Sequence, residues 1–78
     1  MTETAQNIMK LFIDRRGIEP GSVLIISELR RKAAEWGTQH ATGLEAAMEE
    51  LKAEGYVIIT HPHGLELTSR GVSYLLED

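Results

Sequence analysis

The chain contains no cysteine, only two prolines and a single tryptophan among its 78 residues. Without cysteine the protein has no disulfides, no thiolate metal ligands and no cysteine nucleophile, and this composition fits a reducing compartment. The longest aliphatic run, Val23 to Ile26, is far shorter than the roughly 20 residues that span a bilayer. The first four residues also lack the basic start of a signal peptide. We therefore expect a cytoplasmic protein with no membrane association.

Basic side chains are scarce in the second half of the chain. Residues 1–40 carry six basic and five acidic side chains, whereas residues 41–78 carry two basic and seven acidic ones. The formal net charge of the whole chain is −4. Because an acidic surface repels polyanions, this distribution argues against nucleic-acid binding. The hydrophobic fraction of 42% is typical of a globular chain, and the length predicts a single domain, 1–78.

Apolar residues recur at helical spacing in three segments. In the first segment Ala5, Ile8 and Met9 begin a stripe at i, i+3 and i+4, which is the pattern of an amphipathic helix. A glycine follows each segment, and glycine readily takes the left-handed conformation that ends helices. The three expected helices cover about residues 3–16, 28–36 and 39–54.

Hydroxyl side chains stand where the expected helices begin. Ser27 is placed to cap the second helix. Two starts remain open for the third helix, because Thr38 precedes its apolar pattern and Thr42 opens a capping-box sequence. Thr68 is a natural N-cap for a last helix, which we place at 69–76.

The remaining apolar residues predict β-structure. Residues 23–26 form a short, largely β-branched segment, which is typical of one buried strand or of an extended segment that leads into the next helix. Residues 56–67 alternate in polarity on both sides of a turn and predict a β-hairpin. Within that turn Pro62 suits the second position of a type I turn, and we expect Gly64 to take a positive φ.

Two motifs carry a family resemblance. Leu51 to Val57 reads LKAEGYV and looks like the segment that closes a recognition helix and opens a wing. Leu67 to Gly71 reads LTSRG and is similar to the segment that follows the wing. With this order of elements, the chain resembles the winged helix-turn-helix superfamily, especially small bacterial and archaeal members, over nearly its whole length. The resemblance implies an α+β fold, a winged helix with a three-helix core.

The resemblance also implies a function and a set of binding residues. In the family the helix matching 39–54 lies in the DNA major groove, and the hairpin tip contacts phosphate or the minor groove. The expected function is therefore that of a DNA-binding, transcription-regulator-like protein with duplex DNA as partner. Of the candidate nucleic-acid-binding residues, Gln39, His40 and Thr42 are expected to read bases, and Arg30 and Arg31 to hold phosphate. The other two candidates, His61 and His63, lie at the hairpin tip.

So few cations in one module predict weak DNA binding, which a homodimer would strengthen. Helix 3–16 and helix 69–76 are expected to form that dimer. Its candidate residues are Leu11, Tyr74 and Leu76.

Acidic residues on the expected recognition helix support an alternative. Glu45, Glu49 and Glu50 would oppose phosphate if no cations accompanied them. The same three residues would suit a non-catalytic winged-helix module for protein–protein interaction, whose acidic face meets a basic partner. The basic cluster of Arg30, Arg31 and Lys32 could equally meet an acidic partner. We favour DNA binding from the fold and keep the interaction module as the alternative.

Other chemistry has little support in the sequence. His61 and His63 have no third metal ligand at local spacing, so we expect no metal site. Glutamates on an exposed helix lack the burial that shifts the pKa of catalytic carboxylates, so we expect neither an enzyme nor a cofactor. Trp36 is spaced with Leu29 on one helix face, and we expect its ring to be buried in the core.

Overall fold

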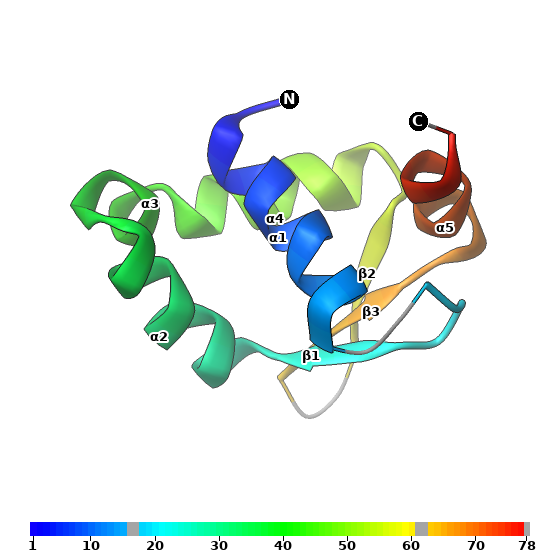
Figure 1. Cartoon of the computed structure of the whole chain (residues 1–78), viewed down its shortest axis with the longest axis horizontal. Coiled ribbons are helices and arrows are strands. Elements are labelled where there is room, and N and C mark those ends of the chain that lie inside the picture. Colours follow the sequence, from blue (N-terminus) through cyan, green and yellow to red (C-terminus); the bar gives the residue numbers. More distant parts are fainter. Residues whose placement is uncertain (16–17, 61–62, 78) are drawn as a thin grey trace.

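The computed structural model describes residues 1–15, 18–60 and 63–77, without the side chain of Arg15. The predictions that rest on Gly17, His61 and Pro62 lie outside the described residues. Within the described residues, five helices and a small three-stranded antiparallel sheet confirm the expected α+β class (Figure 1). The elements are α1 (Glu3–Arg15), β1 (Val23–Ile25), α2 (Ile26–Trp36), α3 (Thr38–Thr42), α4 (Leu44–Ala53), β2 (Val57–Thr60), β3 (Gly64–Leu67) and α5 (Ser69–Leu76).

The expected single helix 39–54 is wrong, because the chain forms two helices, α3 and α4, that meet at Gly43. Gly43 has φ −89° and ψ 5° and is the N-cap of α4, without a side-chain hydrogen bond. Glycine costs about 1 kcal/mol relative to alanine inside a helix, so the chain breaks most easily here. Neither expected start, Thr38 or Thr42, therefore caps one long helix.

The start of α2 also differs from the prediction. Ser27 was expected to cap this helix, but the helix begins at Ile26, directly after β1, and no side chain caps it. The backbone N–H of Ile26 donates to the carbonyl of His63 at 3.0 Å. This bond to the hairpin satisfies one of the first four N–H groups of α2, which have no partner within the helix.

The sheet has β3 in its centre, paired antiparallel with β1 on one side and β2 on the other. The pairs Val57 with Leu67 and Thr60 with Gly64 confirm the expected hairpin. The prediction of a positive φ at Gly64 is wrong, since His63 takes it instead, at 61°. Gly64 is required for another reason. A Cβ at this position would lie 2.7 Å from the Thr60 side chain and equally close to that of Val23.

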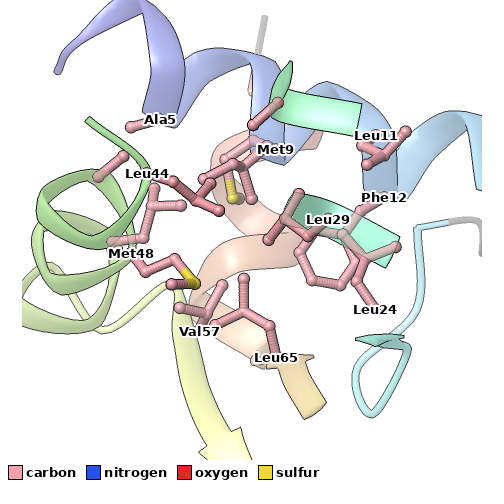
Figure 2. Packing of buried hydrophobic residues seen from close by; sticks show 14 of the residues in the cluster. Ala5, Met9, Leu11, Phe12, Leu24, Leu29, Leu44, Met48, Val57 and Leu65 are labelled. Carbon is pink, nitrogen blue, oxygen red and sulfur yellow. The ribbon is translucent and has the colours of Figure 1, made fainter. Parts of the chain in front are cut away.

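One apolar core joins the helices to the sheet. Figure 2 shows Met9 of α1, Leu29 of α2, Met48 of α4 and Leu65 of β3 converging on it. The ring of Trp36 is only partly buried and packs against the edge of this core, so the expected burial is confirmed in part. The fully or nearly fully buried side chains are Ala5, Ile8, Met9, Phe12, Leu29, Ala33, Leu44, Ala47, Leu51, Val57, Leu65 and Leu67.

Helix α5 is held against the start of the hairpin. The hydroxyl of Thr68 accepts from the backbone N–H of Gly71 at 3.0 Å and donates to the carbonyl of Gly55 at 2.6 Å, which confirms the predicted N-cap. Tyr74 stacks on Tyr56 with ring centroids 4.7 Å apart. These contacts place α5 beside the end of α4.

We predict that Gly71→Ala destabilises the protein. Gly71 is buried, and a Cβ there would collide with the carbonyl oxygen of Tyr56 and with the side chain of Leu67. Overpacking of this kind costs about 1–3 kcal/mol, which urea denaturation would measure. Ser73→Ala in the same helix is the control, since Ser73 is exposed and such a change stays within about 0.5 kcal/mol. Equal effects of the two substitutions would contradict the close approach of α5.

Candidate interaction face on helix α4

Helix α4 divides sharply into a buried side and an exposed side. Leu44, Ala47, Met48 and Leu51 are buried in the core. The α4 face, as we call the exposed side together with the cap residue that follows it, consists of Glu45, Ala46, Glu49, Lys52, Ala53 and Glu54. Glu45 and Glu49 were both predicted to lie on this surface, and both do. The α4 face therefore carries three carboxylates and one ammonium group.

Two of these carboxylates already have cationic neighbours. Arg30 of α2 lies 3.7 Å from Glu45, and Lys52 lies 3.8 Å from Glu49. All four side chains are more than half exposed, and ion pairs of this kind contribute only about 0–1 kcal/mol. The arginine expected to hold phosphate is thus drawn toward the acidic side of α4, by a weak and exchangeable contact.

Glu50 does not belong to the α4 face, contrary to its selection as a partner-binding residue. Its carboxylate accepts from the backbone N–H of Thr2 at 3.2 Å and from the Thr2 hydroxyl at 3.1 Å. The amino group of Met1 lies 3.7 Å away. The Thr2 N–H above all, with the hydroxyl and this positive amino group, lowers the pKa of Glu50 despite some desolvation. Glu50 therefore holds the start of the chain against α4.

His40 is not available at the surface, which contradicts its expected role in reading bases. Its side chain is buried, with Nδ1 2.7 Å from the Thr4 hydroxyl and Nε2 3.5 Å from the carboxylate of Glu3. The ring also meets Trp36 edge-on, with centroids 6.1 Å apart. Contacts with α1, far away in the sequence, turn His40 inward.

The other DNA-binding candidates are scattered. Gln39 and Thr42 are exposed on α3, and Arg31 is exposed on α2. His63 is exposed in the turn directly before β3, and His61 lies outside the part of the chain that the structure describes. The structure thus places these candidates on α2, on α3 and in the turn before β3.

The residues predicted for a dimer do not form one exposed surface. Leu11 is buried, because α1 turns it toward the core. Tyr74 is half-buried, and its hydroxyl donates to the sulfur of Met1 at 3.6 Å. Leu76 is 67% exposed. A groove of about 470 Å³ does separate α1 from α5, lined by Gln6, Met9, Lys10, Ile13, Tyr74, Leu75 and Glu77.

A second groove, between α1 and α2, was not anticipated from the sequence. It has a volume of about 400 Å³ and lies next to Trp36. Its α1 residues recur at helical spacing beside the apolar stripe, and this was the only signal in the sequence that could have indicated it. The lining residues are Glu3, Asn7, Lys10, Leu11, Asp14, Lys32, Trp36 and His40.

Comparison with protein-family models, with curated proteins and with solved structures gave no match. Among the residues that the structure describes, no three His, Asp or Glu side chains are grouped so that they could hold a metal ion. In the same part of the chain, no helix has both the length and the apolar composition needed to cross a membrane.

We predict that Glu50 makes stability depend on pH in the acid range. Because the folded-state pKa of Glu50 lies below its ordinary value of 4.5, its stabilisation is fully present above that value and is lost as the pH falls through the folded-state pKa. Glu50→Gln should therefore be less stable than wild type at about pH 7, and the difference should shrink at about pH 3. Urea denaturation at both pH values measures this difference.

Glu49→Gln provides the matched control on the same helix. Its carboxylate makes only an exposed pair with Lys52, so its substitution should change stability little at either pH. A pH-independent difference between wild type and Glu50→Gln would disprove the carboxylate contact with Thr2.

Proposed function

We propose that the chain is a winged-helix domain that binds a protein partner through the α4 face and has no catalytic role. The order of the elements supports this assignment, since α2, α3 and α4 are followed by the β2–β3 hairpin. The sheet order β1-β3-β2 also agrees with it. A fold does not fix a function, so the choice of partner depends on the charges of the α4 face.

The excess of carboxylates on the α4 face is the observation that carries the proposal. A helix in the major groove lies between two rows of phosphates, and DNA binding gains most of its non-specific affinity from lysine and arginine contacts to them. Here Glu45, Glu49 and Glu54 would face the phosphates, and Lys52 is the single cation of the face. This arrangement opposes DNA and attracts cationic groups.

The partner that fits this face is a segment rich in lysine and arginine. Arg30 and Lys52 already occupy such positions beside Glu45 and Glu49. Since these exposed pairs are weak, the cations of a partner can replace them at small cost. Charge complementarity of this kind gives an interface its specificity and its rate of association.

Duplex DNA remains the second candidate because of residues outside α4. Gln39 and Thr42 are exposed on α3, and Arg31 is exposed on the neighbouring α2. Amide and hydroxyl side chains can bond to base edges, and arginine can bind phosphate. In this arrangement α3, and not the acidic α4, would approach the DNA.

We predict that the double substitution Glu45→Lys and Glu49→Lys weakens binding of a cationic partner. The probe is a fluorescently labelled peptide rich in lysine and arginine, followed by anisotropy at low ionic strength. Loss of two close charge pairs should weaken binding at least about tenfold. Wild type should not bind a labelled DNA duplex under the same conditions.

The matched control is the double substitution Glu19→Lys and Glu77→Lys. Both residues are exposed and lie outside α4, and this variant changes the net charge by the same amount. It should keep most of the peptide affinity. If both variants lost the same amount of peptide affinity, net charge alone would explain the effect. Salt-dependent binding of the duplex by wild type, lost in Arg31→Ala, would favour the DNA candidate instead.

A further inference from the structure

Strand β2 is an open edge of the sheet, because β3 lies between β1 and β2. The carbonyl of Tyr56 accepts an N–H from the residue after β3 at 3.1 Å, and two residues further along Ile58 pairs with Glu66. In an antiparallel pair the backbone groups of successive residues alternate in direction. Val57 and Ile59 therefore direct their N–H and C=O groups away from β3.

The open edge lacks the usual protection against pairing. Natural edge strands carry lysine, proline or bulges that prevent pairing with another chain. Val57–Thr60 contains no charge and no proline, and Ile58 and Ile59 are 47% and 48% exposed. The opposite edge, β1, runs directly into α2 at Ile26.

On the outer face of the sheet, apolar side chains of β1 and β2 flank Glu66 of β3. Val23 and Ile58 both pair with Glu66, so these three residues share one face of the sheet. Ile25 stands two residues after Val23 and lies on the same face. Ile25 and Ile58 are both nearly half exposed. An added strand beside β2 would cover part of Ile58 and continue this surface.

We propose that β2 pairs in antiparallel register with β2 of a second copy of the chain, with the two-fold axis at Ile58. In this register Val57 of each copy faces Ile59 of the other. The outward N–H and C=O groups of both residues then form four hydrogen bonds. Ile58 of one copy faces Ile58 of the other as a non-hydrogen-bonded pair, in which side chains approach closely. The two sheets become one sheet of six strands.

The absence of charge on β2 selects a second copy as the partner. The chain carries a net charge of −4, so most surfaces of two copies repel each other. The β2 edge brings no charged side chains into opposition. The nearest carboxylates on this face, the two Glu66 side chains, would stand three strand spacings apart, roughly 14 Å. That distance exceeds the Debye length of about 8 Å at physiological ionic strength.

The short strand limits the strength of this dimer. Stable interfaces bury about 800 Å² on each partner, and a four-residue edge buries less. The dimer is therefore weak and depends on concentration. The pairing uses backbone groups of β2 and not the carboxylates of the α4 face, so the proposal does not rest on which partner that face binds.

Disulfide trapping tests the register directly, because the chain has no cysteine of its own. Residues in a non-hydrogen-bonded antiparallel pair have Cα atoms about 4.5 Å apart, which a disulfide can bridge. Ile58→Cys should therefore form covalent dimers on oxidation with copper phenanthroline. Ile25→Cys is the control on the same face. In the proposed dimer the two residues at position 25 would lie five strand spacings apart, roughly 24 Å, so this variant should form no covalent dimer.

Sedimentation equilibrium over a range of concentrations tests the dimer without a cross-link. Ile58→Lys places two ammonium groups opposite each other and should raise the dissociation constant at least about tenfold. Leu76→Lys changes an apolar side chain of α5 that is 67% exposed, and it should leave the dissociation constant unchanged. Circular dichroism checks that both variants fold.

Three outcomes would overturn the proposal. One is a wild-type chain that remains monomeric at millimolar concentration. Another is equal cross-linking at positions 25 and 58. The third is dissociation by Leu76→Lys but not by Ile58→Lys, which would place the dimer on the α1–α5 groove.

Discussion

The pairing of β3 with both of its neighbours is the constraint on which the rest of the structure depends. Leu65 and Leu67 are fully buried, and the backbone of their strand is hydrogen-bonded along both edges. This pairing brings β1 beside the hairpin, although the two are far apart in the sequence. It also sets the first residue of α2, since Ile26 bonds to the carbonyl of His63. Burial of apolar surface then holds α1 and α4 against this frame (Figure 1).

Helix α4 has a buried side and an exposed side with different chemistry. Its apolar residues complete the core, while its exposed carboxylates make only weak local pairs. Glu50 differs, because its bonds to Thr2 hold the start of α1 in place. Glu45 and Glu49 can exchange their weakly held cations for those of another molecule. Glu50 cannot do so without releasing Thr2 and the start of the chain. The charges of α4, more than the fold, thus decide which partner we propose.

Much of the fold followed from local patterns. The apolar stripe of α1, the hairpin and the Thr68 cap of α5 were all predictable, because each depends on residues close together in the chain. The break at Gly43 and the uncapped start of α2 were not. The break at Gly43 depends on a competition between helix propensity and packing. The start of α2 depends on the hydrogen bond that the Ile26 N–H donates to the distant hairpin.

The candidate site was predictable only where exposure follows from helical spacing. Glu45 and Glu49 lie on the surface because the apolar residues of α4 fix which side turns inward. By itself, then, the sequence determined the periodicity of each element, its charge and its exposed acidic side. Only the tertiary structure decided that His40 is buried against Thr4 and that β2 remains an open edge. Such contacts join segments far apart in the chain, and the local spacing of residues carries no information about which segments meet.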